Sequence, residues 1–279
     1  MTKIVLLRRK KLGKTSCEGI AQFAKSKIEV VRNDLGIPDA DIYIRWGCTS
    51  TVPHTPGRKI WNQKSAIHIV GNKAGFRAIL NEHALCPSTW FDWKDVLPQE
   101  FPVVVRPQVH AQGKQVYFCE GPVQMFTAVD KCGPGYYISQ FINKVKEYRV
   151  FVVQGRAVWV ANKVPGNPDD VAWNVAQGGK FENVRWHEWP LKVVKVSIQA
   201  FKLYGLDFGG VDVMVDAHGN CYVLEINSAP SQTSSYRQEC TAKAFDYMIK
   251  NGTQVIDLIE QPGGYLKFIH PAIEESALV

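Results

Sequence analysis

Residues 209–230 read GGVDVMVDAHGNCYVLEINSAP. Two short runs rich in β-branched and aromatic residues flank the turn-forming residues 217–220, which predicts an antiparallel hairpin. If Asp216 faces Cys221 across a four-residue loop, Asp212 lies opposite Glu225, and Asn227 lies two residues further along the same face. One face of the hairpin is then apolar, while the other carries two opposed carboxylates.

Two carboxylates directly opposite each other repel, so this pair predicts a bound cation. Mg²⁺ is the natural candidate, because it binds one or two carboxylates and fills its remaining positions with water and phosphate. Asn227 adds a neutral oxygen ligand, and Pro230 ends the second strand just beyond it. The alternative from these residues alone is a solvated acidic hairpin.

A Gly-Val-Asp strand, a turn and a Val-Leu-Glu-Ile-Asn-Ser-x-Pro strand resemble the metal-binding hairpin of the ATP-grasp superfamily. The resemblance is strongest to its ribosomal-protein glutamate ligases and similar amino-acid ligases. In that family the Asp, Glu and Asn hold the Mg²⁺ ions that bridge the phosphates of ATP. The resemblance therefore implies Asp212, Glu225 and Asn227 as metal ligands, with ATP and two Mg²⁺ ions as cofactors and Mn²⁺ as a substitute.

The composition is that of a soluble globular protein, with 46% hydrophobic and 21% charged residues among 279. No apolar run approaches a membrane span, and the first residues turn basic too early for a signal peptide, so we expect a cytoplasmic protein without membrane contact. Seven cysteines without a Cys-x-x-Cys spacing predict free thiols. The net charge of +7 fits a nucleotide as readily as nucleic acid.

The first 70 residues predict a small α/β lobe, with strands near 3–7, 28–31 and 41–46 and a helix that runs through Lys25. A strand, Gly13-Lys14-Thr15 and a helix outline a P-loop, but Arg8 stands where that motif needs glycine, which favours a basic loop before a helix. Residues 45–47 read Arg-Trp-Gly at the end of a strand. They are either a substrate contact or a buried Trp beside a surface Arg.

From Gly71 onwards the pattern changes to a helix at 72–80, a strand at 101–107 and a loop at 110–114 with flanking cations. This order resembles the small ATP-grasp subdomain. The resemblance implies nucleotide contacts from Lys73, Arg106, His110, Gly113 and Lys114. Arg106 stands where the family usually has lysine, and its guanidinium keeps the charge and can bind phosphate bidentately.

Residues 137–142 and 144–153 read as two further strands. Their junction resembles the ATP-grasp hinge, which implies Phe141 and Ile142 at the adenine and Glu147 at the ribose hydroxyls. Arg149 shares a strand face with Glu147 and would point at phosphate or at the acyl substrate. Without the resemblance, Glu147 and Arg149 could be a surface ion pair worth about 1 kcal/mol or less.

Lys163 follows the strand at 156–160, and Asn174 precedes Gly178-Gly179. In the family a basic residue lies near the γ-phosphate at the first position, and an Asn with a Gly-Gly turn occupies the second. The resemblance therefore implies Lys163 and Asn174, together with Arg149, as catalytic residues. A Trp-Asn loop with paired glycines is otherwise only a turn. A helix is expected at 193–203, a polar loop suited to substrate contact at 231–236, and a second helix at 240–250.

We therefore predict an α+β protein with an ATP-grasp fold, in which two α+β subdomains sandwich ATP, preceded by a small α/β lobe. The expected units are the lobe at 1–70, the ATP-grasp domain at 71–252 and a C-terminal tail at 253–279. Within the ATP-grasp domain, residues 71–141 would bind the nucleotide, and residues 142–252 would bind metal and substrate. The resemblance covers about residues 71–250.

The activity that the resemblance implies is ATP- and Mg-dependent ligation of a carboxylate to an amine, through an acylphosphate, with release of ADP and phosphate. The partners would be small-molecule carboxylate and amine substrates, with a peptide or protein as another acceptor class. A small-molecule kinase on the same scaffold and a non-catalytic nucleotide-binding module remain alternatives. A nucleic-acid-binding protein is a further alternative, against which the scattered cations and the lack of a recognised binding motif argue.

Overall fold

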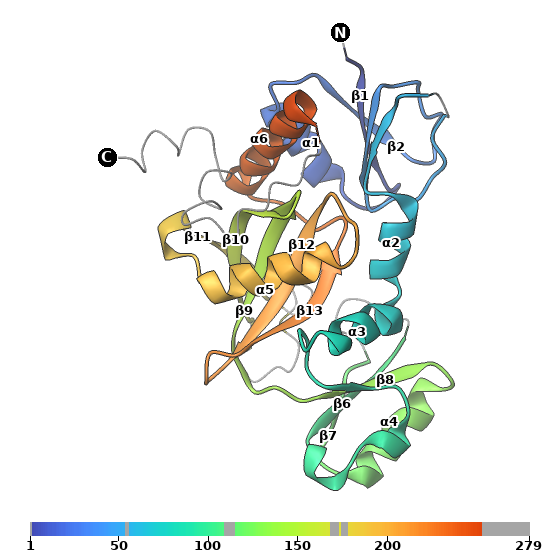
Figure 1. Cartoon of the computed structure of the whole chain (residues 1–279), viewed down its shortest axis with the longest axis vertical. Coiled ribbons are helices and arrows are strands. Elements are labelled where there is room, and N and C mark those ends of the chain that lie inside the picture. The colour runs from blue at the N-terminus through green and yellow to red at the C-terminus, as the bar shows by residue number, and fades with distance from the viewer. Residues whose placement is uncertain (1, 54–55, 109–114, 168–172, 174–177, 253–279) are drawn as a thin grey trace.

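The structure is a computed structural model that describes residues 2–53, 56–108, 115–167, 173 and 178–252. Three sheets follow one another along the long axis of the molecule (Figure 1). The sheet that begins the chain lies at the top of this view, the largest sheet lies in the middle, and a small sheet lies at the bottom. Together with the helices they confirm the predicted α+β class.

The first sheet is parallel, with strand order β2-β1-β3-β4. Every residue of β1 and β3 is buried, which explains why these segments read as short, mainly apolar runs. A Cβ added to Gly13 would approach the Trp46 indole to 2.9 Å, and the Gly13 φ is +79°. This close packing favours the basic-loop interpretation over a P-loop. The elements are β1 (Ile4–Arg8), α1 (Lys14–Phe23), β2 (Ile28–Arg32), β3 (Ile42–Trp46) and β4 (Lys59–Trp61).

The small sheet is antiparallel, with strand order β5-β8-β6-β7, and α4 packs on it around Val103, Val105 and Met125. Two helices lead into it rather than the one predicted, because Asn72 ends the first and caps the second by accepting the Gly75 N–H. The elements are α2 (Lys64–Gly71), α3 (Lys73–Glu82), β5 (Thr89–Trp90), β6 (Val103–Pro107), β7 (Tyr117–Cys119), α4 (Pro122–Cys132), β8 (Tyr136–Gln140) and the 3₁₀ turns Trp93–Asp95 and Pro98–Glu100.

The central sheet is antiparallel throughout, with strand order β11-β10-β9-β12-β13. The small sheet connects to it directly, because β8 is followed by β9. Its elements are β9 (Lys144–Val153), β10 (Arg156–Val164), β11 (Lys180–Val184), the 3₁₀ turn Trp186–Glu188, α5 (Leu191–Lys202), β12 (Phe208–Asp216), β13 (Cys221–Asn227) and α6 (Ser235–Asn251).

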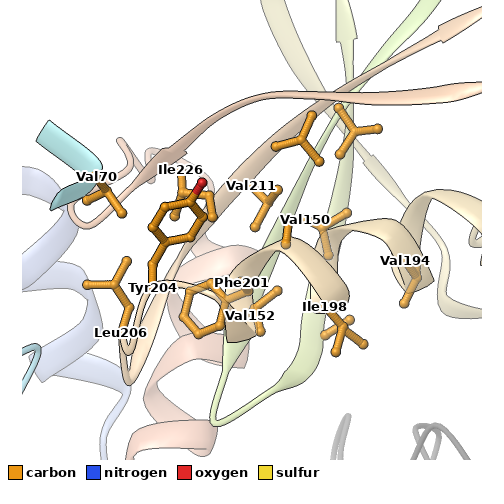
Figure 2. Close-up of a cluster of buried hydrophobic side chains, with 14 of the residues drawn as sticks. Val70, Val150, Val152, Val194, Ile198, Phe201, Tyr204, Leu206, Val211 and Ile226 are labelled. Carbon is orange, nitrogen blue, oxygen red and sulfur yellow. The ribbon is translucent and has the colours of Figure 1, made fainter. Parts of the chain in front are cut away.

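Alternation along the strands gives the central sheet two different faces. One face packs against α5 and the segment that follows it, and Figure 2 shows this contact with the strand valines beneath the helix. The labelled side chains of this cluster are Val70, Val150, Val152, Val194, Ile198, Phe201, Tyr204, Leu206, Val211 and Ile226.

The opposite face is aromatic at the end nearest the first sheet. Phe151 stacks on Trp159, with ring centroids 5.2 Å apart and an interplanar angle of 3°. Phe208 stacks on Trp46 of β3 at 5.5 Å and meets Phe245 of α6 edge-on at 4.9 Å. The first sheet, the central sheet and α6 therefore share one hydrophobic core.

The turn of the β12–β13 hairpin differs from the one assumed from the sequence. Asp216 N–H donates to the Asn220 carbonyl, so the loop has three residues instead of four. Gly219 adopts a φ of 76°, and the Asp216 carboxylate accepts the N–H groups of His218 and Asn220. A three-residue loop with a left-handed glycine is a common hairpin connection.

The pairing of Asp212 with Glu225 is nevertheless confirmed. Val213 pairs with Val223 and not with Leu224, because the register shifts between Asp212 and Val213. One extra residue on β13, Leu224, restores the predicted pairing beyond that point, as a β-bulge does. The shorter loop and the bulge shift the strand register in opposite directions, so Asp212 still pairs with Glu225.

Two further expectations are corrected by the structure. Helix α6 begins at Ser235 rather than near 240, so Ser235 and Tyr236 are helical and do not belong to a polar loop. Arg45 is 5% exposed and donates to the Ser50 carbonyl, so it is not the surface arginine expected beside Trp46.

All seven cysteines are free thiols, as predicted. Among the described residues, none of the helices has the length and apolar character needed to cross a bilayer.

The boundaries at residues 70 and 141 remain a prediction, and the tail 253–279 lies outside the described residues. Contacts across the first boundary are extensive. Asn62, fully buried, donates its backbone N–H to Asp207 at 2.5 Å and its side-chain amide to the Phe208 carbonyl at 3.0 Å. Asp207 also accepts from Gln154, so it holds the first sheet against the central one.

Candidate active site

The second face of the central sheet changes from aromatic to charged along its strands. On β9, Phe151 is followed on the same face by Arg149 and then Glu147, and on β10 Trp159 leads to Lys163 at the charged end. On β12, Asp212 lies opposite Arg149. Strand alternation therefore places the predicted charged residues on one face of the sheet. The valines between them lie on the other face and pack against α5.

Arg149 and Asp212 form a bidentate pair. The Arg149 Nε and Nη2 donate to Asp212 Oδ1 and Oδ2 at 2.5 and 2.7 Å, and Asp212 is 2% exposed. Burial lowers the pKa of the Arg149 guanidinium, but the carboxylates of Asp212, Glu225 and Glu147 together outweigh burial and raise it. The arginine therefore stays charged, and the two parallel hydrogen bonds fix its plane.

Glu147 lies between two lysines. Lys144 Nζ donates to its Oε2 at 2.6 Å, and Lys163 Nζ donates to its Oε1. Lys163 Nζ also lies 3.7 Å from Asp212 Oδ2 and so connects the two carboxylates. Burial lowers the pKa of Lys144, whereas Asp212 and Glu147 together outweigh burial and raise the pKa of Lys163. The predicted ribose contact of Glu147 remains a prediction.

Glu225 is held from the small-sheet side. Lys73 Nζ, in the first turn of α3, donates to Glu225 Oε2 at 2.9 Å, and Asn227 Nδ2 donates to Oε1 at 2.8 Å. Burial alone would raise the pKa of the Glu225 carboxyl, but Lys73, Asn227 and Arg149 hold it well below its usual range. Glu225 is therefore an anion, as a metal ligand must be.

The remaining described nucleotide candidates lie on the small sheet and at its exit. Arg106 is on β6, where burial lowers the pKa of its guanidinium more than the nearby Tyr137 and Glu225 raise it. Phe141 and Ile142 are half-buried in the connection between β8 and β9, and Phe118 meets Phe141 edge-on at 4.7 Å. This connection joins the two sheets, which is the position expected of the hinge.

Gly210 leaves the room that Arg149 needs. A Cβ at Gly210 would lie 3.0 Å from Pro230 Cβ and 3.3 Å from Arg149 Cδ. Both contacts are tighter than side chains normally make, so the absence of a side chain on β12 lets the arginine stem cross the strand. The sequence offered only the Gly209-Gly210 pair as a signal for this contact.

The donor set fits a magnesium ion in its chemistry. Asp212 and Glu225 supply carboxylates, and Asn227 Oδ1 accepts no hydrogen bond from the described residues. The described residues include no group of three or more His, Cys, Asp or Glu side chains placed to hold a metal. Two carboxylates and one amide would leave further positions to water and phosphate, as Mg²⁺ prefers.

Four predicted site residues lie outside the described residues: His110, Gly113, Lys114 and Asn174. Conversely, the structure adds two cations that the sequence reasoning did not single out. Lys144 pairs with Glu147 although residues three apart in a strand normally lie on opposite faces, and a register shift next to Lys144, which the sequence does not reveal, accompanies this contact. Arg237 lies in the first turn of α6, and a serine at 235 followed by Gln238 three positions later is a helix-start signal that could have placed it.

A small antiparallel sheet joined through the β8–β9 connection to a larger one, with an Asp–Glu–Asn hairpin and cations from both units, defines a protein of the ATP-grasp class. The model of the RimK-like ATP-grasp domain matches residues 91–249, which is more than half of the chain. The chain therefore belongs to the RimK-like ATP-grasp family.

Curated relatives are similar over part of their length. A protein of Hahella chejuensis (strain KCTC 2396) named "Probable alpha-L-glutamate ligase 2" is 25% identical over 158 residues, which are 54% of this chain and 50% of that protein. The D-alanine–D-alanine ligase of Acinetobacter baylyi is 33% identical over 98 residues, 32% of this chain and 31% of that protein. The chain thus spans about half the length, or less, of the curated relatives it matches.

Solved structures are similar over most of the chain. A Chryseobacterium gregarium RiPP-associated ATP-grasp ligase, in complex with ADP and a leader and core peptide, superposes with a TM-score of 0.65 at 13% identity over 87% of this chain and 96% of that one. The D-alanine–D-alanine ligase of Bacillus anthracis in complex with ATP gives 0.62 at 17% identity over 98% and 99%. At these identities the likeness confirms the ATP-grasp fold.

Proposed function

We propose that this protein is an ATP-dependent ligase that joins the carboxylate of one substrate to the amine of another. The observation that supports this most is the opposed Asp212–Glu225 pair, with Asn227 beside it and three cations in contact with the two carboxylates. A solvated acidic hairpin would not bury Asp212 or surround it with Arg149 and Lys163. Curated relatives that match part of the chain are named as ligases.

Nucleotide binding is assigned to the small-sheet side of the site. Lys73 and Arg106 would bind phosphate oxygens, and Phe141 and Ile142 would contact the adenine. Glu147 would bind the ribose hydroxyls. The loop residues His110, Gly113 and Lys114 complete this assignment, which rests on the sequence for these three. Magnesium, as two ions that Mn²⁺ could replace, would be held by Asp212, Glu225 and Asn227 and would neutralise phosphate charge.

The residues of the chain carry the chemistry mainly by position and charge. The acid substrate would attack the γ-phosphorus of ATP to give an acylphosphate and ADP, and the amine would then displace phosphate from it. Arg149 and Lys163, both buried beside Asp212, would stabilise the charge that grows at the transferred phosphoryl group. Asn174 is proposed as a third catalytic residue on sequence grounds.

The substrates are proposed at the level of class. The acid and the amine are small molecules such as amino acids, or the acceptor is a peptide. A curated relative is named for glutamate, and a structural neighbour was solved with a leader and core peptide. We propose a cytoplasmic location and expect neither membrane contact nor specific nucleic-acid binding.

Hydroxylamine tests the reaction class before the amine is known. With Mg-ATP and a panel of amino acids and peptides as acids, an acylphosphate is intercepted as a hydroxamate, together with equal amounts of ADP and phosphate. Mass spectrometry of the products identifies the acid. A stable phosphorylated product without hydroxamate would instead establish a kinase, and ATP binding without turnover would establish a nucleotide-binding module.

Asp212→Asn and Glu225→Gln test the metal assignment. Each removes one negative charge while keeping the shape of the side chain, so the hydroxamate rate should fall by a factor of about 100 or more while the fold is retained. Circular dichroism checks the fold, and Asp130→Asn, a change of the same kind on α4 of the small sheet, serves as the control. Full activity in either site variant would contradict the assignment.

A further inference from the structure

Arg237 is a buried cation next to the proposed catalytic residues. It lies in the first turn of α6 and is 4% exposed. Its guanidinium carbon lies 5.6 Å from the Trp159 ring centroid and 5.7 Å from that of Phe181. The same Phe181 ring has the Arg149 guanidinium carbon at 4.6 Å and the Lys163 Nζ at 5.6 Å. Three cations therefore surround one aromatic side chain of β11.

Among the residues that the structure describes, Arg237 has neither a carboxylate nor a hydrogen-bond partner, and its Nε is buried without an acceptor. Arg149 and Lys163 each contact a carboxylate, so Arg237 differs from both. Burial, and to a lesser extent the charge of Arg149, lower the pKa of the Arg237 guanidinium. A buried charge of this kind is costly unless an anion completes the site.

The start of α6 adds donors to the same place. Ser234 makes no side-chain capping bond, and the first turn holds no acidic residue. Ser234 Oγ instead accepts a hydrogen bond from Asn183 Nδ2 at 3.1 Å, which joins the helix start to β11. Free N–H groups and the positive end of the helix dipole favour an anion beside Arg237.

The strand order of the central sheet separates Arg237 from the proposed nucleotide side. Glu225 and Lys73 lie at the β13 edge of the central sheet. The Glu225 carboxylate also interacts electrostatically with Arg106. Arg237 lies over β10 and β11, on the other side of the Arg149–Asp212 pair. An anion held there would lie beside Arg149 and Lys163 on the side away from Lys73 and Glu225, which under the proposed function is the side left for the acid substrate.

The charges of the described side chains support a substrate with a second anionic group. A nucleoside triphosphate with two divalent ions is close to neutral, so it would leave the excess of positive charge on the protein uncompensated. The cations of the described part of the site are Lys73, Arg106, Lys144, Arg149, Lys163 and Arg237, against the carboxylates Glu147, Asp212 and Glu225.

We propose that Arg237 binds a second carboxylate of the acid substrate, so that this enzyme selects an acid with two carboxylates, one of which is activated beside Arg149. The substrate class is a small dicarboxylate or an acidic amino acid. This inference rests on the proposed function, because it names the acid of that reaction and the residue that selects it.

Calorimetric titration without ATP tests the site independently of turnover. The probes are glutarate and its monoamide glutaramate, which differ only in that one carboxylate becomes an amide. The wild-type protein should bind glutarate at least about tenfold more tightly than glutaramate. Arg237→Gln should abolish most of that difference, and Arg237→Lys should keep part of it. Arg185→Gln, which removes an exposed arginine just after β11, should behave as wild type.

Thermal unfolding separates binding from a structural role. Because Arg237 is buried with neither a carboxylate nor a hydrogen-bond partner among the described residues, Arg237→Met should leave the Tm unchanged or raise it, whereas the loss of a residue that holds the fold would lower it. In hydroxamate assays Arg237→Gln should raise the KM of the acid at least about tenfold and leave the KM of ATP within about twofold.

Three results would overturn the assignment of Arg237. They are no saturable binding of glutarate by the wild-type protein, an affinity for glutarate that Arg237→Gln leaves unchanged, or a Tm that falls with Arg237→Met. If the protein binds glutarate through Arg237 but forms no hydroxamate with any acid, the ligase proposal fails while the dicarboxylate site stands. If hydroxamate forms and Arg237→Gln leaves the KM of the acid unchanged, the ligase proposal stands while the assignment of Arg237 fails.

Discussion

Gly210 shows how one missing side chain positions the charge of another. The Arg149 stem lies 3.3 Å from where a Cβ would be, and Pro230 lies on the same side at 3.0 Å. Pro230 is rigid and Arg149 is fixed by its two bonds to Asp212, so neither can move without loss. The glycine therefore belongs to the site although it has no functional group.

We expect Gly210→Ala to lower kcat/KM by roughly 10- to 100-fold, because a displacement of the Arg149 guanidinium by a fraction of an ångström spoils its alignment. Hydroxamate formation measures the effect. Gly36→Ala is the matched control, since a Cβ there meets nothing within 4 Å, and it should be as active as wild type. An active Gly210→Ala protein would show that the arginine position is not critical.

Contacts between distant residues mark the limit of what the sequence predicts at this scale. Lys73 and Glu225 are 152 residues apart, and no periodicity links them. Their common site followed only from the family resemblance. Arg237 was missed because a helix-start signal at 235–238 indicates a helix and not a binding residue. Its burial without a carboxylate among the described residues is known only from the structure. The pairing of Asp212 with Glu225, by contrast, follows from local alternation.

At the scale of elements, most strand positions were predictable because Gly, Pro and polar clusters bound each apolar run, whereas β4, β5 and β11 were not predicted. Helix α2 was missed, because only the helical pattern that starts at Asn72 was recognised and the residues before it were assigned to the first lobe. The hairpin turn was also missed. A four-residue loop, and a three-residue loop with a bulge at Leu224, place Asp212 and Glu225 in the same pairing, so alternation cannot distinguish them.

The turn itself can be tested through Gly219, which has a φ of +76° and open space around its Cα. Gly219→Ala should reduce the free energy of unfolding by about 1 kcal/mol, because alanine resists the left-handed region. Gly219→Asn should lose less, since asparagine tolerates that conformation. Urea denaturation measures both variants. Equal stability of the Ala and Asn variants would argue against a left-handed residue at this position.

At the scale of the whole molecule, the first sheet is not an appendage. Trp46 is 1% exposed and packs against Phe208 of the central sheet and Phe245 of α6. Because one core serves the first sheet, the central sheet and α6, we expect them to unfold together. The sequence predicted a lobe at 1–70 but gave no sign of this shared core, since the partners of Trp46 are more than 100 residues away.

Trp46→Ala should lower the free energy of unfolding by about 3–5 kcal/mol, as expected when a large aromatic side chain leaves a cavity. Far-UV circular dichroism and tryptophan fluorescence should follow the same single transition in urea. Phe91→Ala, at a side chain that is 41% exposed, should change stability by about 0.5 kcal/mol or less. An early transition confined to the first sheet would show that its core is separate.

The ion pairs of the site bear on whether the chain can fold before its ligands bind. The three carboxylates of the site already contact cations from the chain itself: Lys73 for Glu225, Arg149 for Asp212, and two lysines for Glu147. Small metal-nucleated domains cannot fold until their ion arrives. Here we expect the chain to fold without its ligands, and in the proposed function nucleotide binding would move lysine and arginine side chains from carboxylate to phosphate.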